Sequence, residues 1–166
     1  IGDTQSSERA KKLIQLALQN ENPSFMVILG DFVMEPDLWD HRFFLMQMAR
    51  EIKPTFPVFL VSGNHDIDYT STKIMNPERR VTPEIYESLY GPRNFDFIFN
   101  DCLFIICGID LRNPTGYLNY LRETLSQKGL GKKYIFIFIH YAPERLVKYK
   151  GGSALPSEDE FFSLVK

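Results

Sequence analysis

The chain has 166 residues, of which 44% are hydrophobic and 24% charged, and its formal net charge at pH 7 is −2. This length supports one domain with a sizeable core, and the small net charge argues against a nucleic-acid groove or an anionic membrane surface as the main partner. No apolar run reaches the roughly 18 residues that a membrane span needs.

Strand-like apolar runs alternate with helical patterns, which is typical of an α/β sheet. In the first half we expect a helix capped by Ser6 or Ser7 and ended by Asn22-Pro23, followed by a strand, a helix and a strand at residues 25–29, 36–53 and 58–61. The inward face of the second helix is predicted to hold Leu45, Met48, Ala49 and Ile52. His41, with Asp37 and Asp40 nearby, is predicted to lie on the surface.

The second half begins with a long polar loop at residues 66–81, and such loops are uncommon in compact domains unless they are functional or disordered. Arg79 and Arg80 in this loop have planar forks suited to phosphate, but a solvated loop face is the preferred interpretation. After this loop we predict a helix from Thr82-Pro83 to near Gly91 and then a hairpin of strands 95–99 and 102–107. A helix at 116–128 and a strand at 134–139 follow. The last predicted helix is opened by the capping-box pattern Ser157-x-x-Glu160.

Cys102 and Cys107 lie five residues apart in one strand-like run. An odd offset places them on opposite faces of the strand, so we do not expect a disulfide between them. Their presence as free thiols leaves the cellular compartment open. With no repeat or linker in view, residues 1–166 are predicted to form a single domain that is truncated at both ends.

Four short motifs directly follow strand-like runs. They are Gly2-Asp3-Thr4-Gln5, Gly30-Asp31-Phe32, Gly63-Asn64-His65-Asp66 and Ile139-His140-Tyr141. Groups just past the carboxyl ends of strands share one crevice in an open α/β sheet, and oxygen and nitrogen donors of these kinds hold divalent metals. The motifs therefore predict a common metal site.

Each motif also has a plainer interpretation when taken alone. Asp31 could be a turn or cap residue, Asn64-His65 a simple turn, and His140 a histidine satisfied by hydrogen bonds at a strand end. Asp110 ends a strand and more often serves a turn than a metal. The order of the four motifs and their strand context favour the functional interpretation.

The order of these motifs resembles the calcineurin-like metallophosphoesterases, most specifically through Gly63-Asn64-His65-Asp66. The resemblance runs from Asp3 to about His140. It implies a layered α/β/β/α fold, with two mixed sheets packed face to face and helices outside. It also implies hydrolysis of a phosphomonoester or phosphodiester through a two-metal site and a metal-bound hydroxide.

The resemblance further implies roles for individual residues. Asp31 would bridge two divalent ions (Mn²⁺, Fe, Zn²⁺ or Mg²⁺), with Asp3 on the first ion and Asn64 and His140 on the second. Gln5, which stands where the family usually has His, is a provisional ligand through its side-chain oxygen.

The remaining implied roles concern a small phosphorylated substrate. Asn64 and His65 would bind it, and His65 would contact the phosphoryl oxygen or protonate the leaving oxygen. Asp66 would orient His65. The sequence leaves the oligomeric state open.

The sequence also departs from the family pattern. Its three histidines are His41, His65 and His140, so the later Gly-His-x-His motif is missing. Either the chain is an incomplete piece of a longer protein, which we favour, or this version lacks the motif. For the piece alone we expect weak or single-metal binding and little activity. Met34 stands where a Tyr marks the purple acid phosphatase branch, which argues against that branch.

Two rival functions remain. A catalytically silent interaction module that keeps the fold is favoured by Gln5 and the missing motif, and opposed by the intact Asn64-His65 pair. A dinucleotide-binding sheet is disfavoured because no Gly-x-Gly-x-x-Gly follows any strand.

Overall fold

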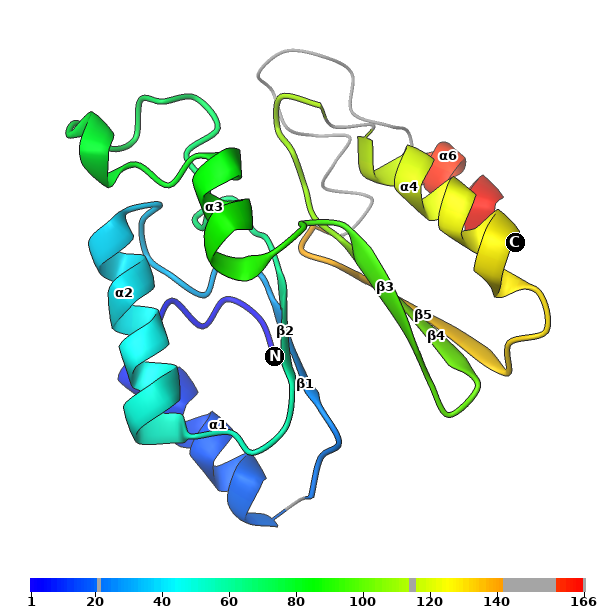
Figure 1. Cartoon of the computed structure of the whole chain (residues 1–166), viewed down its shortest axis with the longest axis horizontal. Coiled ribbons are helices and arrows are strands. Elements are labelled where there is room, and N and C mark those ends of the chain that lie inside the picture. The colour runs from blue at the N-terminus through cyan, green and yellow to red at the C-terminus, as the bar shows by residue number, and fades with distance from the viewer. Residues whose placement is uncertain (21, 114–115, 142–157, 166) are drawn as a thin grey trace. The chain divides into compact units, whose positions relative to one another are not determined.

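The computed structural model describes residues 1–20, 22–113, 116–141 and 158–165. The chain forms two compact units, Ile1–Gly91 and Pro92–Lys166 (Figure 1). Helices accompany a two-stranded sheet in the first unit and a three-stranded sheet in the second. This mixed composition confirms the predicted α/β class.

The sheet of the first unit is parallel. Strands β1 (Met26–Leu29) and β2 (Val58–Val61) pair in register, from Met26 opposite Val58 to Leu29 opposite Val61. Ile1 lies next to β1 and is hydrogen-bonded to it. The Ile1 ammonium donates to the Val27 carbonyl at 3.2 Å, and the Leu29 amide donates to the Ile1 carbonyl at 2.6 Å. The segments that follow Ile1, β1 and β2 therefore leave one end of this small sheet together.

Capping side chains set where the helices of the first unit begin. Helix α1 (Glu8–Asn20) is capped by Ser7, whose hydroxyl accepts from the Ala10 amide at 3.2 Å, whereas Ser6 donates to the Phe32 carbonyl. Asp37 caps α2 (Leu38–Gln47), which continues as a π-helical turn, η1 (Met48–Ile52). Thr82 caps α3 (Pro83–Tyr90).

The inward face of α2 and η1 was predicted only in part. Met48 and Ile52 are buried, but Leu45 and Ala49 are exposed, and Phe44 is buried in their place. The prediction that His41 lies on the surface is wrong, because its ring is 1% exposed and packs edge-on against Phe32. Helical spacing marks a stripe of apolar residues but does not show which edge of the stripe the sheet covers.

The segment at residues 66–81 is held to the rest of the first unit by backbone and side-chain contacts. Ile67 and Asp68 are buried, and the Asp68 amide donates to the Val81 carbonyl at 2.9 Å. A short 3₁₀ helix, η2 (Pro77–Arg79), lies near its end. Arg79 pairs with Asp37 at 2.8 Å and Arg80 donates to the Ile74 carbonyl at 2.7 Å, so both guanidinium groups have partners within the unit.

The second unit contains a mixed sheet. Strand β3 (Phe95–Phe99) pairs antiparallel with β4 (Cys102–Cys107), which pairs parallel with β5 (Tyr134–Ile139). Helix α4 (Gly116–Thr124) continues as a π-helical turn, η3 (Leu125–Gly129), and lies beside α6 (Glu158–Val165) (Figure 1). Ser157, predicted to open this last helix, lies outside the described residues.

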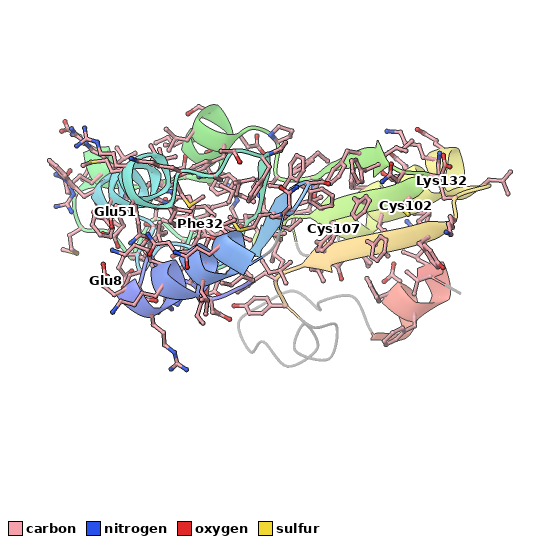
Figure 2. The ribbon with its side chains drawn as sticks, turned by 90° about the horizontal axis from the view of Figure 1, so that it is seen from below. Glu8, Phe32, Glu51, Cys102, Cys107 and Lys132 are labelled. Atoms are coloured by element: carbon pink, nitrogen blue, oxygen red, sulfur yellow. The ribbon has the colours of Figure 1, made fainter. Side chains whose placement is uncertain are left out.

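The two faces of this sheet pack differently. One face forms the core with α4, through Leu103, Ile105, Cys107, Tyr117, Leu118 and Leu121. The other face carries a row of stacked rings, in which Phe104 lies 4.9 Å from Phe97 and 4.9 Å from Phe136 between ring centroids. Both cysteines of β4 are free, as predicted (Figure 2). No helix among the described residues has the length and apolar character needed to cross a bilayer.

Candidate functional site

Asp31 joins three segments of the first unit. It follows β1 with φ of 49°, in the left-handed region that Asp and Asn enter more easily than most residues. Its side chain accepts from the His65 amide at 2.9 Å, and its carbonyl accepts from the Gln5 amide at 2.9 Å. Asp31 is 4% exposed, so these contacts fix a nearly buried carboxylate between the segments that follow Ile1, β1 and β2.

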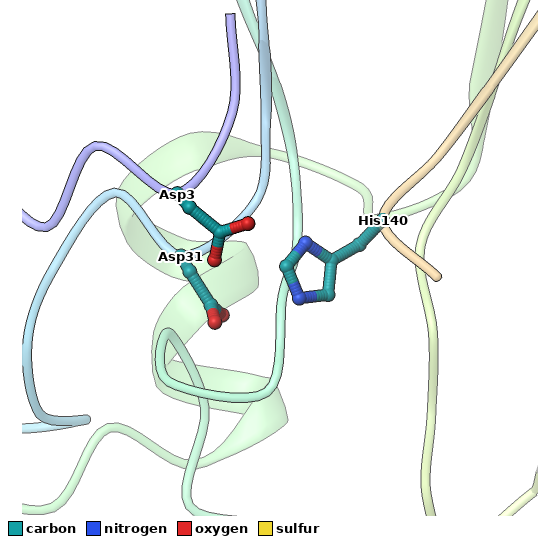
Figure 3. Close-up of side chains that lie close together, drawn as sticks. All are labelled: Asp3, Asp31 and His140. Carbon is teal, nitrogen blue, oxygen red and sulfur yellow. The ribbon is translucent and has the colours of Figure 1, made fainter. Parts of the chain in front are cut away.

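The Asp3 carboxylate lies beside the Asp31 carboxylate. The Asp3 amide donates to the Gly30 carbonyl at 3.1 Å, and a carboxylate oxygen of Asp3 lies within 4.8 Å of one of Asp31 (Figure 3). Two negative charges this close repel one another, and a cation between them relieves that repulsion. Hard divalent ions prefer such oxygen donors, so the donor set fits a divalent metal.

Asp66 organises the turns after β1 and β2. Its carboxylate is 0% exposed and accepts from the backbone amides of Asp31 (2.9 Å), Phe32 (2.9 Å), Val33 (3.3 Å) and Gly63 (2.7 Å). An orienting effect of Asp66 on the His65 ring stays a prediction, and the carboxylate also holds main-chain groups of both turns. This function was not predicted, because sequence spacing does not reveal which buried amides converge on one carboxylate.

Electrostatic effects at Asp66 oppose one another. Burial raises the pKa of its carboxyl to about 7, the Gly63 amide lowers it, and the nearby Asp31 charge raises it. Because both oxygens receive N–H donors, the hydrogen bonds favour the ionised form. Gly63 is required at this place, because a Cβ there would overlap the Asp31 side chain and amide.

His65 is oriented by the carbonyl of Met34, at 2.6 Å from Nδ1. A carbonyl only accepts, so Nδ1 carries the hydrogen, and in the neutral ring Nε2 then has the lone pair. The preceding residue, Asn64, has its carbonyl contacted by the Lys73 ammonium at 2.6 Å. Asn64 and His65 are both half-buried, which suits groups that meet a substrate.

A buried histidine supports the turn from the side of α2. His41 Nε2 donates to the Asp66 carbonyl at 3.0 Å, and the Tyr90 hydroxyl donates to His41 Nδ1 at 2.9 Å. Burial lowers the pKa of His41 to about 4, so the ring is neutral at pH 7. A lone histidine in a helical stretch gave no sequence signal for this contact.

The second unit contains His140, the remaining residue predicted to bind metal. His140 directly follows β5 and is half-buried. Asp110 accepts from the Arg93 guanidinium at 3.0 Å and from the Arg112 amide at 2.8 Å. Asp110 therefore serves a turn and ion pairs, which was the preferred interpretation of this residue.

Within the first unit, the structure brings several predicted residues together. Asp3, Gln5, His65 and Asp66 each make a hydrogen bond to Gly30 or Asp31, and Asn64 lies between Gly63 and His65 in the same turn. The arrangement can hold a cation between carboxylates and present one imidazole nitrogen to a bound ester. The assignment of Asp3, Gln5, Asp31, Asn64 and His140 as metal ligands stays a prediction.

The comparisons with known proteins identify a family for this chain. A family model described as calcineurin-like phosphoesterase matches residues 1–161. The match spans both units and includes every predicted site residue from Asp3 to His140. A comparison with curated proteins gives no match.

Proposed function

The chain belongs to the calcineurin-like phosphoesterase family, and from this premise we propose that it hydrolyses a phosphomonoester or phosphodiester at a two-metal site. The family supports a metal-dependent phosphoester hydrolase in general terms. The observation that carries the proposal for this chain is the pair of neighbouring carboxylates, Asp3 and Asp31, next to the turn that contains His65.

The metal ligands are proposed from all four motifs. Asp31 would contact both ions, Asp3 and Gln5 would hold the first ion, and Asn64 and His140 would hold the second. Mn²⁺, Fe, Zn²⁺ and Mg²⁺ all suit these oxygen and imidazole donors. When bound, such ions polarise the phosphoryl group and lower the pKa of a coordinated water.

The protein's own residues would position the ester and move a proton. With Nδ1 hydrogen-bonded to the Met34 carbonyl, His65 has Nε2 available to contact a phosphoryl oxygen or to protonate the leaving oxygen. Asp66 contributes indirectly, because its hydrogen bonds to amides set the path of both turns.

We also propose that residues 1–166 act as one domain on a small phosphorylated substrate. The family match across both units supports this. The main rival is a silent interaction module that keeps the fold. The Gln5 amide bonds to the Asp31 carbonyl through the main chain, a contact that any residue except proline could make, so this contact does not decide between the enzyme and the rival.

Hydrolysis of a chromogenic phosphomonoester and a chromogenic phosphodiester by the full-length gene product tests the proposal. With Mn²⁺ we expect turnover that a chelator abolishes and that falls by at least about 100-fold in Asp31→Asn and His65→Ala. Asp101→Asn makes the same chemical change at an exposed turn between β3 and β4, and should retain activity. No turnover, together with no metal retained by the intact protein, would establish the interaction module instead.

A further inference from the structure

A small cavity lies beside the candidate site, within the first unit. It has a volume of about 200 Å³ and is lined by Gln5, Ser6, Met34, Asp40 and Phe43. Two of its lining side chains are large and apolar yet open to solvent, with Met34 51% and Phe43 52% exposed. Exposed apolar side chains around a cavity are typical of a ligand-binding surface.

Hydrogen bonds connect the walls of this cavity to the candidate site. The Gln5 amide donates to the Asp31 carbonyl at 2.9 Å, and the Met34 carbonyl accepts from His65 Nδ1 at 2.6 Å. The cavity is thus one hydrogen bond away from both a proposed metal ligand and the proposed proton donor. The cavity therefore adjoins the segments that carry the proposed site, where the organic group of a bound phosphate ester would lie.

The charge of the cavity indicates what kind of group it accepts. None of the five lining residues is basic, and one of them, Asp40, is acidic. The Asp40 side chain accepts from the Glu35 amide at 3.0 Å, which holds the carboxylate in place. A carboxylate next to the aromatic ring of Phe43 attracts a cation by charge and by the ring's π face, and it repels an anion.

We propose that this cavity binds the organic group of the phosphate ester and selects a compact cationic alcohol over an anionic one of the same size. The inference rests on the proposed function and adds its substrate class. The volume supports a compact group, because sites for drug-sized ligands measure about 300–1,000 Å³. Met34 and Phe43 contact its alkyl part, and Asp40 offsets its charge.

Three esters of similar size and different charge test this selectivity. They are choline phosphate, its uncharged isostere 3,3-dimethylbutyl phosphate, and the phosphate ester of 4-hydroxybutyrate, which carries an extra carboxylate. With Mn²⁺ and the full-length gene product, we expect kcat/KM to fall in that order, with at least about a tenfold gap between the cationic and the anionic ester. Calorimetric binding of the matching phosphonates should follow the same order.

Two variants test whether Asp40 and Phe43 cause the preference for the cationic ester. Asp40→Asn keeps an oxygen acceptor for the Glu35 amide and removes the charge, so it should bring the cationic and uncharged esters to within about twofold of each other. Phe43→Ala, at an exposed position, should lower kcat/KM for both of these esters by about tenfold. Glu78→Gln makes the same charge change on exposed η2, and should leave the order unchanged.

The outcomes separate this inference from the proposed function. If the chromogenic esters are hydrolysed but the three test esters react equally, or if Asp40→Asn keeps the wild-type order, the cavity does not select a cation. If no ester is hydrolysed, the proposed function is wrong, and the phosphonate series then decides the inference alone. Equal binding of the three phosphonates would overturn it.

Discussion

Asp66 shows how one buried carboxylate can define a site without contacting a ligand. It accepts four amide hydrogens, three from the turn after β1 and one from the turn after β2. These turns carry Asp31 and Asn64, so the positions of both proposed ligands depend on the same side chain. The sequence singled out Asp66 through its motif, but the spacing of residues gave no sign of its four contacts with main-chain amides.

Replacing Asp66 with Asn should destabilise the protein by about 3 kcal/mol. The amide group of Asn presents its own N–H donors to backbone N–H donors, so amides that Asp66 satisfies would lose their acceptor. Urea unfolding measures the change in the free energy of unfolding. The control Asp101→Asn, at an exposed turn, should stay within about 0.5 kcal/mol of the wild type, and a loss below about 1 kcal/mol in Asp66→Asn would contradict this account.

At the scale of elements, the sequence predicted most boundaries but fewer of the contacts between elements. Strands β2 to β5 match the predicted ranges, because runs of apolar and aromatic residues between turn-forming pairs are a strong local signal. The burial of His41 and the contacts that hold residues 66–81 were missed. Both depend on partners distant in sequence, such as Tyr90 for His41, which a local pattern does not contain.

The burial of His41 in α2 predicts a dependence of stability on pH. Its pKa is about 4 in the folded protein, against about 6.5 in an unfolded chain. Below pH 6.5 the unfolded chain therefore binds a proton that the folded protein does not. The stability contributed by neutral His41 is complete above pH 6.5 and is lost as the pH falls towards 4, by up to about 3 kcal/mol.

Unfolding free energies of the wild type and His41→Gln between pH 4 and 7.5 check this prediction. The variant should be less stable at pH 7.5 and should change less with pH over this range. Asp66, whose pKa burial raises to about 7, contributes with the opposite sign, but it is present in both proteins. The difference between the two curves therefore reports His41, and parallel curves would rule out this role.

At the scale of the whole molecule, the predicted class and family are confirmed, and the motif order carried most of that information. The family match covers residues 1–161, and helices accompany two sheets as expected for an α/β protein. The site as a whole stays a prediction, with ligands proposed from both compact units. Asp3, Asp31 and Asn64 belong to the first unit and His140 belongs to the second.

Metal binding should stabilise the molecule and show whether His140 contributes. An ion at 100 times its dissociation constant adds about 2.7 kcal/mol to the stability of the state that binds it. For a chain of this size we expect Mn²⁺ to raise the melting temperature by about 5–10 °C, as one transition if the two units unfold together. Differential scanning calorimetry with Mn²⁺ and then with chelator measures the shift.

Substitutions of ligands in each unit complete this test. Asp3→Asn and His140→Ala should each reduce the Mn²⁺ shift to less than half, because each removes a proposed donor. Asp101→Asn should retain the full shift. A full shift in His140→Ala would remove that residue from the ligand set and confine metal binding to the first unit.

The dependence of the site on main-chain hydrogen bonds has a consequence for protein engineering. Asp66 recognises peptide amides, which every residue except proline has, so the frame it builds does not depend on which donor side chains the two turns carry. Libraries at positions 3, 5 and 64 could thus explore new metal preferences, while Gly63, Asp66 and Asp31, whose side chain accepts from the His65 amide, are kept constant. During evolution, single substitutions of a donor side chain could change the metal preference while the two turns keep their path.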